Sequence, residues 1–132
     1  MKLGYSEFNL GTTLSSLKRG VLTSRKEVFI AKTNNAEDIL RLLYRKGFIE
    51  GYELNSPFIF KVYLKYWNGQ SLIKNLKLIS RPSKRVYLGV PGIKNRLMTG
   101  RLAVFSTSKG LLTSIECLYL NIGGEALFEV LF

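Results

Sequence analysis

The sequence contains no histidine and a single cysteine, Cys117, in 132 residues. Histidine is the side chain that most often acts as a general base near neutral pH, and it is a common zinc ligand, so its absence removes both roles. One cysteine cannot form an intramolecular disulfide, which fits a reducing compartment. The run SIECLYL predicts a short helix in which Cys117 is a small buried core residue rather than a reactive thiol. We expect no metal site and no cofactor.

Long apolar runs are also missing. No segment approaches the roughly 18 consecutive apolar residues that cross a bilayer as a helix. The first 20 residues lack an apolar signal core, place Glu7 early and hold no arginine before Arg19, so we expect no cleaved leader. The rival function, a basic module at a membrane surface, requires an amphipathic helix with cations on one face and aromatic residues on the other. The sequence offers no such helix, and Trp67 is expected in a turn.

Acidic residues are absent from residues 54–115, a stretch that contains eleven lysines and arginines. The whole chain has twenty basic and nine acidic side chains, which gives a formal net charge of +11. A charge of this size, concentrated in a segment apolar enough to fold, indicates a polyanionic partner, with nucleic acid before a membrane. The alternative is a solvated basic face that has no specific partner.

Two helices are expected in the first third of the chain. The first ends at Gly20 and the second ends before Gly47, because glycine commonly follows the last helical turn. Ser, Thr, Asp and Asn favour the N-cap because their side chains accept from free backbone N–H groups. The candidate N-caps are Thr12 or Thr13 for the first helix and Asn34 or Asn35 for the second.

Runs rich in β-branched and aromatic residues alternate with turn residues along the rest of the chain, and apolar residues make up 46% of it. The expected strands cover residues 27–31, 48–54, 58–66, 71–79, 86–90, 102–105 and 125–132, with short helices at 91–98 and 114–120. This order predicts an α/β (α+β) fold class, with two small mixed α/β subdomains packed together: residues 1–70 and residues 71–132.

The stretch FSTSKGLLT, residues 105–113, gathers hydroxyl side chains and a lysine in an expected loop. Ser106 and Lys109 have the S-x-x-K spacing of a serine nucleophile, but Gly110 opposes the helix that this pair needs, and no S-D-N or K-T-G motif occurs. Phosphate-binding and dinucleotide-binding glycine motifs are also missing, so we predict no catalytic residue. The hydroxyls can instead bind RNA edges, 2′-hydroxyls or phosphates, or they can satisfy the backbone of their own turn.

A second stretch, SRPSKRVYLGV, places Arg81, Lys84 and Arg85 shortly before Tyr87. Cations next to an aromatic ring suit phosphate contact combined with stacking on an unpaired base. The alternative for Tyr87 is a strand residue that faces the core. The two stretches together favour RNA binding over the other functions considered.

Three stretches, ISRPSKRVY, GRLAVFSTSKGLLT and LNIGGEALFEVLF, closely resemble the C-terminal half of the small-subunit ribosomal protein eight family, and LYRKGFIEGYEL resembles its N-terminal helix-to-strand passage. The resemblance covers nearly the whole chain. It implies a structural, non-enzymatic two-domain protein that binds the central domain of small-subunit ribosomal RNA, assists assembly and adjoins other small-subunit ribosomal proteins. It implies no membrane partner and no small-molecule substrate. A general nucleic-acid-binding module without a ribosomal role is the alternative.

The resemblance also implies which residues bind RNA. The main site is expected in the C-terminal subdomain, with further contacts from the N-terminal one. The implied residues are Ser106, Thr107, Ser108 and Lys109 in the hydroxyl-rich stretch, the stacking Tyr87, the group Gly123, Gly124 and Glu125, and the N-terminal cations Lys18, Arg19 and Lys32. The basic and aromatic pattern described above adds the cations Arg81, Lys84 and Arg85 to the predicted RNA-binding residues. The bias towards Leu, Ile, Phe, Tyr, Asn and Lys favours an organelle-encoded protein of the mitochondrial matrix, with a bacterial cytoplasm as the alternative.

Overall fold

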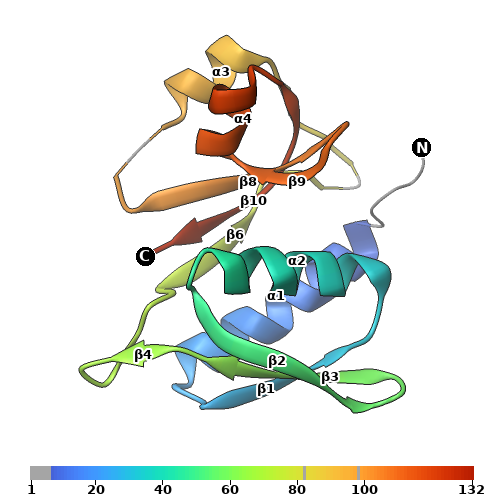
Figure 1. Cartoon of the computed structure of the whole chain (residues 1–132), viewed down its shortest axis with the longest axis vertical. Coiled ribbons are helices and arrows are strands. Elements are labelled where there is room, and N and C mark those ends of the chain that lie inside the picture. The colour runs from blue at the N-terminus through green and yellow to red at the C-terminus, as the bar shows by residue number, and fades with distance from the viewer. Residues whose placement is uncertain (1–6, 82, 98) are drawn as a thin grey trace. The chain divides into compact units, whose positions relative to one another are not determined.

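The computed structural model describes residues 7–81, 83–97 and 99–132, without the side chains of residues 7–9 and 34; residues 1–6, Pro82 and Met98 lie outside the described part. Helices and antiparallel strands are mixed along the chain (Figure 1), which confirms the predicted fold class. By its contacts the chain divides into two compact units, Met1–Asn75 and Leu76–Phe132. The sequence pattern places the boundary nearby, at residue 70.

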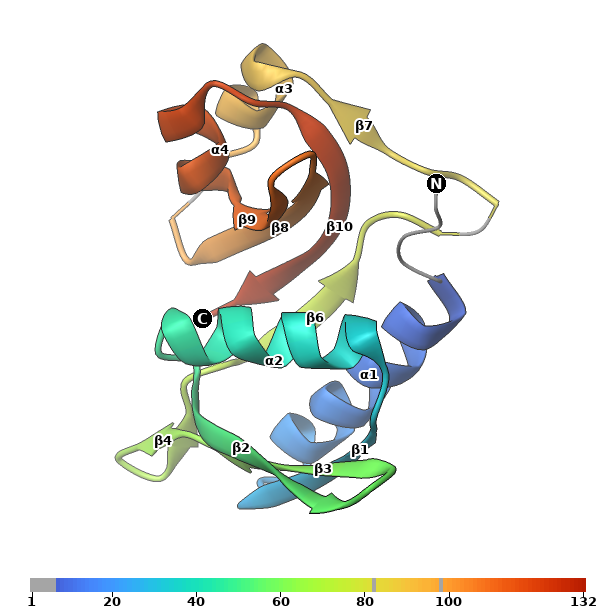
Figure 2. The ribbon, with the colours of Figure 1, turned by 45° about the vertical axis from the view of Figure 1, so that its right-hand side comes forward.

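The first unit is a three-stranded antiparallel sheet with two helices on one face (Figures 1 and 2). The strand order is β1-β3-β2, and a small hairpin of β4 and β5 follows. Residues of β3 alternate between the helix side, where Phe60, Val62 and Leu64 are buried, and the outer side. The elements are α1 (Glu7–Leu22), β1 (Glu27–Ala31), α2 (Asn34–Arg45), β2 (Ile49–Ser56), β3 (Ile59–Leu64), β4 (Tyr66–Trp67) and β5 (Gln70–Ser71).

Both predicted ends of the first helix are wrong. Helix α1 already includes Glu7, so Thr12 and Thr13 lie inside it, and Thr13 is buried. The helix also continues past Gly20 to Leu22, because Gly20 serves packing rather than termination. A Cβ at Gly20 would collide with Cγ2 of Val28 on β1, so only glycine lets the helix lie this close to the strand.

The second helix ends before Gly47 as predicted, but its N-cap is one residue earlier than expected. The Thr33 hydroxyl accepts a hydrogen bond from the Ala36 backbone N–H at 3.0 Å, whereas Asn34 and Asn35 are the first two helical residues. At the other end, Gly47 adopts a φ of 81°, the left-handed conformation that glycine adopts readily. The turn expected at residues 67–70 is present as the tip of the β4–β5 hairpin: Trp67, the last residue of β4, pairs with Gln70, and Asn68 and Gly69 between them have positive φ angles.

The second unit is built on the long strand β10, which pairs with β8 on one side and with β6 and β7 on the other (Figure 2). The hairpin partner of β8 is β9. All the strands and short helices expected in this region are present, although most differ in length from the prediction. They are β6 (Asn75–Leu78), β7 (Tyr87–Leu88), α3 (Val90–Asn95), β8 (Arg101–Thr107), β9 (Gly110–Thr113), α4 (Ser114–Leu120) and β10 (Gly124–Leu131).

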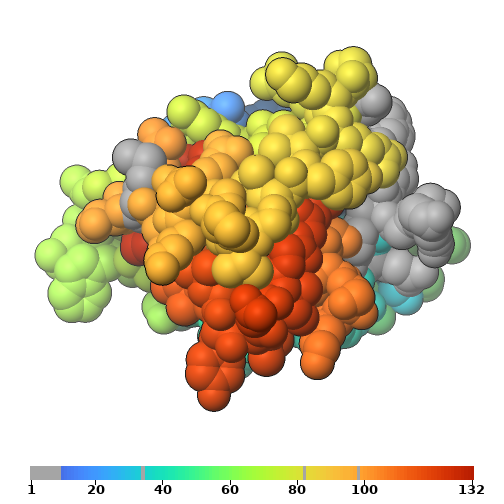
Figure 3. Space-filling model, turned by 90° about the horizontal axis from the view of Figure 1, so that it is seen from above, coloured from blue at the N-terminus to red at the C-terminus, as the bar shows by residue number. Residues whose placement is uncertain are grey.

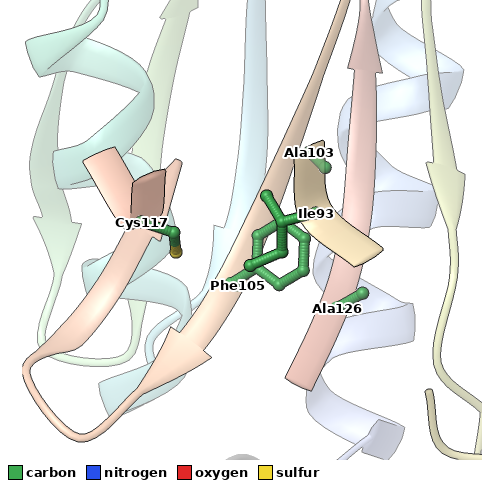
Figure 4. Packing of buried hydrophobic residues seen from close by; sticks show 5 residues of the cluster. All are labelled: Ile93, Ala103, Phe105, Cys117 and Ala126. Atoms are coloured by element: carbon green, nitrogen blue, oxygen red, sulfur yellow. The ribbon is translucent and has the colours of Figure 1, made fainter. Parts of the chain in front are cut away.

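Helices α3 and α4 supply residues to a core on one face of this sheet (Figure 4). Cys117 belongs to this core and is fully buried, which confirms its predicted structural place. Burial, and secondarily the charge of Glu116, raise the pKa of the Cys117 thiol, so the reactive thiolate is disfavoured. The central cluster consists of Ile93, Ala103, Phe105, Cys117 and Ala126.

The two glycines of α1 provide a matched test of the packing against β1. Gly20→Ala is expected to lower the free energy of unfolding by about 1–3 kcal/mol, because the added methyl group must displace Val28. Among the described side chains, none lies within 4 Å of the position that a Cβ at Gly11 would take, so Gly11→Ala should raise stability by about 0.5–1 kcal/mol through helix propensity. Urea unfolding followed by circular dichroism measures both, and equal stability of the two variants would contradict the packing role of Gly20.

Candidate nucleic-acid interface

The hydroxyl-rich stretch is a β-hairpin. The prediction that it forms a loop is therefore wrong except at the tip. Strands β8 and β9 pair in register up to Thr107 and Gly110, which leaves Ser108 and Lys109 as the exposed two-residue turn. Gly110 has a φ of 100°, which favours glycine at the end of this turn. We call Ser106, Thr107, Ser108 and Lys109, with Gly110, the hydroxyl hairpin.

The hydroxyl of Thr107 is used within the turn. It donates to the Gly110 carbonyl oxygen at 2.8 Å and accepts from the Lys109 backbone N–H at 3.1 Å. A hydroxyl has one proton to donate, so Thr107 has no donor left for a ligand. The turn-forming alternative therefore applies to Thr107, whereas Ser108 and Lys109 are exposed at the tip.

Three predicted residues form one row across the sheet. Glu125 on β10 is paired with Tyr87 on β7 and with Ser106 on β8. Residues paired in this way point to the same face, which is opposite to the face that carries Phe105 and the helices. Tyr87 is 66% exposed, so the alternative that it faces the core is wrong.

The glycine pair allows this row to form. A Cβ at Gly124 would lie 2.5 Å from the Ser106 carbonyl oxygen, and a Cβ at Gly123 would lie 2.6 Å from the carbonyl oxygen of Leu88. Both distances are too short for any side chain, so glycine is required for β10 to approach β7 and β8. The structure thus gives Gly123 and Gly124 a packing role.

Glu125 carries a carboxylate oxygen that lacks a partner. Its Oε1 lies 4.0 Å from Nη1 of Arg85, and its side chain is 14% exposed. Its Oε2 is buried and accepts no hydrogen bond from the described residues. Leaving a buried carboxylate oxygen unsatisfied costs free energy, which a donor from a ligand would recover.

The predicted cations Arg81, Lys84 and Arg85 lie on residues 81–85, which we call the basic loop. Arg81 and Lys84 exchange two backbone hydrogen bonds of 2.9 Å, so the loop folds back on itself. The buried Ser80 connects the two ends of the loop to β10. Its hydroxyl donates to the Ala126 carbonyl oxygen at 2.5 Å and accepts from the Val86 N–H at 3.0 Å. Figure 3 shows the yellow residues of this region exposed on one face of the second unit.

Sequence reasoning missed Ser80. Its role depends on β10, which lies more than forty residues further along the chain, and a serine at the end of an expected strand carries no local sign of that contact. The predicted serines and threonines are recognisable because they are clustered, whereas Ser80 acts alone.

The three N-terminal cations belong to the other unit. Lys18 and Arg19 lie near the C-terminal end of α1, and Lys32 follows β1, with its backbone N–H donating to the Phe58 carbonyl oxygen at 2.8 Å. All remaining predicted residues are in the second unit. The C-terminal residues therefore belong to one unit, and Lys18, Arg19 and Lys32 belong to the other.

Some cations of the acid-free stretch meet acids that come from outside it. The ion pairs are Lys61 with Glu27 at 3.5 Å, Arg85 with Glu125 at 4.0 Å and Arg101 with Glu129 at 3.9 Å. The charge of Glu27 is also the main reason that the pKa of Lys61 is raised. Among the described residues, the other eight cations of residues 54–115 have no ion pair, so a strong positive potential remains.

Within residues 7–81, 83–97 and 99–132, no helix combines the length and apolar character needed to cross a membrane. No cluster of three or more potential metal ligands occurs in the same part of the chain.

An exposed tyrosine in a row with a serine and an unsatisfied carboxylate, in a unit that carries exposed cations, is typical of an RNA-binding protein. Residues 9–131 match the family model of ribosomal protein S8. The chain belongs to the ribosomal protein S8 family, which confirms the resemblance seen in its sequence motifs.

Similar proteins from several organisms cover almost the whole chain. Small ribosomal subunit protein uS8c of Bigelowiella natans is 36% identical over 130 residues, which span 92% of this chain and 97% of that protein. Small ribosomal subunit protein uS8 of Thermus thermophilus is 34% identical over 129 residues, which span 89% of this chain and 93% of that protein. Small ribosomal subunit protein uS8 of Novosphingobium aromaticivorans is 32% identical, with 92% and 95% covered.

The contribution of the two Ser80 hydrogen bonds to stability can be tested by mutation. Ser80→Ala removes a donor and an acceptor from backbone groups near the core, and it should lower the free energy of unfolding by about 1–3 kcal/mol. Ser83→Ala, an exposed change on the same loop, is the control and should stay within about 0.5 kcal/mol of the parent chain. Denaturant unfolding measures both changes, and hydrogen exchange at the Val86 amide should accelerate only in Ser80→Ala. Equal stability and equal exchange rates in the two variants would refute the proposed role of Ser80 in holding the basic loop.

Proposed function

We propose that this chain is a structural, non-enzymatic constituent of the small ribosomal subunit, which binds the central domain of small-subunit ribosomal RNA and assists subunit assembly. Its membership of the ribosomal protein S8 family supports the ribosomal role. The observation that carries the RNA-binding site is the row of Tyr87, Glu125 and Ser106 beside the hydroxyl hairpin. The general nucleic-acid-binding module is not favoured, since the family match covers residues 9–131.

In this proposal the second unit supplies specificity. The exposed ring of Tyr87 offers a stacking surface for an unpaired base, and the hydroxyls of Ser106 and Ser108 can donate to or accept from base edges and 2′-hydroxyls. The free Oε2 of Glu125 accepts from a base amino group, which supplies the hydrogen bond that the protein does not provide. Thr107 contributes by holding the turn that presents Ser108 and Lys109.

Affinity in this proposal comes from the cations. Lys109 at the tip and Arg81 and Lys84 on the basic loop are exposed and suited to phosphate oxygens. Arg85 has a second task, because its guanidinium lies 4.0 Å from Glu125 and offsets part of the charge of that carboxylate. Lys18, Arg19 and Lys32 form a further set of proposed phosphate contacts on the first unit.

The proposed setting is a ribosome of the mitochondrial matrix, with a bacterial cytoplasm as the alternative. Other small-subunit ribosomal proteins are the expected neighbours. The relatives bear the names uS8c and uS8, and they support the ribosomal setting without separating the two compartments. Sequencing of the RNA that co-purifies with the chain separates them, because mitochondrial and bacterial small-subunit RNAs differ in sequence.

The double variant Ser108→Ala with Tyr87→Ala tests the site. Binding to a bulged helix of small-subunit RNA should weaken by roughly 1–3 kcal/mol for each base that the variant can no longer contact. Tyr119→Ala is the matched control, because Tyr119 is an even more exposed tyrosine of the same unit, at 88% against 66% for Tyr87, and lies on α4 outside the proposed site. Filter binding measures all three affinities. Unchanged affinity of the double variant, or an equal loss in Tyr119→Ala, would disprove the assignment.

The electrostatic part of the proposal predicts a steep fall of log affinity with log salt concentration, because phosphate contacts release counterions. Lys84→Ala should reduce the slope by about one unit, since Lys84 makes no ion pair within the described residues. Lys61→Ala should leave the slope unchanged, because the charge of Lys61 is balanced by Glu27 at 3.5 Å. Filter binding between about 50 and 200 mM salt gives the slopes. A flat dependence would favour the solvated basic face instead.

A further inference from the structure

A hollow of about 460 Å³ opens on the second unit, on the inner side of the basic loop. Its size falls in the range of about 300–1,000 Å³ that small-molecule sites occupy. Residues of four kinds line it: cations, aliphatic residues, one hydroxyl residue (Ser83) and one acid. The cations are Lys77 on β6, Arg81 and Lys84 on the basic loop, and Arg96 after α3; the aliphatic wall includes Ile79 and Val86; the acid is Glu129 on β10.

The hollow lies on the other side of the sheet from the row of Tyr87, Glu125 and Ser106. Its acid, Glu129, is paired with Ala103, a member of the core cluster beneath the helices, and Val86 packs against the same cluster. A β-bulge between Ala126 and Phe128 explains why two glutamates four residues apart face opposite sides, since it shifts the alternation of β10 by one residue. The RNA surface described above therefore does not include this acid.

The rim of the hollow carries a positive charge that would attract an anion. Lys77, Arg81, Lys84 and Arg96 are all exposed, and none of them has an ion pair among the residues that the structure describes. Arginine can bind a phosphate through two parallel hydrogen bonds, whereas lysine acts as a point charge. Four such cations around one opening exceed what a single carboxylate within it can balance.

The floor of the hollow has a different chemistry. Glu129 is 7% exposed, and the distance of 3.9 Å between its Oε1 and Nη1 of Arg101 is too long for a hydrogen bond. The carboxylate thus remains available as an acceptor. It would repel the acidic side chains of a peptide, but it suits an amino group of a base, and Ile79 and Val86 offer that base an apolar wall.

We propose that this hollow binds one unpaired nucleotide of the RNA, with its phosphate at the four cations, its base against Ile79 and Val86, and an exocyclic amino group donating to Glu129. The site takes nucleotides whose base carries such an amino group and discriminates against uracil. The inference rests on the proposed RNA-binding function, to which it adds a second contact on the opposite side of the sheet.

Titration of the full chain with cytidine 5′-monophosphate, uridine 5′-monophosphate and inorganic phosphate tests the site, because the two nucleotides differ mainly in an amino group against a carbonyl. Backbone amide shifts in NMR spectra identify the place of binding. The cytidine nucleotide should shift the amides of Ile79, Val86 and Glu129 saturably, with a dissociation constant about two- to tenfold lower than that of the uridine nucleotide. Inorganic phosphate should bind more weakly than either.

Two variants distinguish the phosphate contact from the base contact. Arg96→Ala should weaken both nucleotides by a similar factor, since it removes a phosphate contact from the rim. Glu129→Gln should abolish the preference for cytidine, because the amide can also donate to the uracil carbonyl. If the buried change prevents folding, Arg96→Ala and the comparison of the two nucleotides on the parent chain still decide the question.

Absent shifts around the hollow, equal binding of the two nucleotides, or equal binding of inorganic phosphate would overturn the inference. Such a result together with intact binding to the small-subunit RNA helix overturns only the hollow and leaves the proposed function standing. Cytidine-selective shifts without any affinity for that RNA would instead reject the proposed function and keep the hollow as a nucleotide site.

Discussion

The second unit depends on the close approach of β10 to the strands on both of its sides. Gly124 faces the carbonyl oxygen of Ser106, and Gly123 faces that of Leu88, at separations that leave no room for a side chain. This approach aligns Tyr87, Glu125 and Ser106 in one row. The bulge that follows on the same strand turns Glu129 to the other side, so one strand supplies an acid to each face of the sheet.

Acids and cations are separated along the sequence, and folding brings some of them together again. Glu27, Glu125 and Glu129 all come from outside the acid-free stretch, yet each lies beside one of its cations. The pairs at Glu125 and Glu129, at 4.0 Å and 3.9 Å, are too long for hydrogen bonds, so they act through charge rather than through directional contacts. The uncompensated charge that remains in this unit lies on residues such as Arg81, Lys84 and Lys109, which are exposed and suited to phosphates.

Local sequence patterns were sufficient to predict much of this fold. The wrong predictions concern residues whose roles depend on contacts that are distant in sequence. Alternation and turn residues predicted the hairpin of β2 and β3 and the strand after the glycine pair, because those signals lie within a few residues. The prediction of a helix end at Gly20 was wrong, since the true constraint on this glycine is Val28 on the next element. Ser80 and Glu129 gave no signal at all, because each acquires its role only when β10 and the basic loop are in place.

The hydrogen bonds of Ser80 hold the segments on both sides of the basic loop, which affects how the unit can bind. Three chain segments meet at the hydroxyl of Ser80, which joins the end of β6, the Val86 amide and β10. A loop held in this way loses less conformational entropy when it orders against a ligand, so more of the contact energy remains as affinity. Arg81 directly follows Ser80 and Tyr87 directly follows Val86, the two residues that one of these hydrogen bonds joins, so we expect a change at Ser80 to disturb the exposed ring and the cation together. In the proposed function, the buried hydroxyl of Ser80 therefore supports recognition indirectly, by holding the chain segments that carry Arg81 and Tyr87.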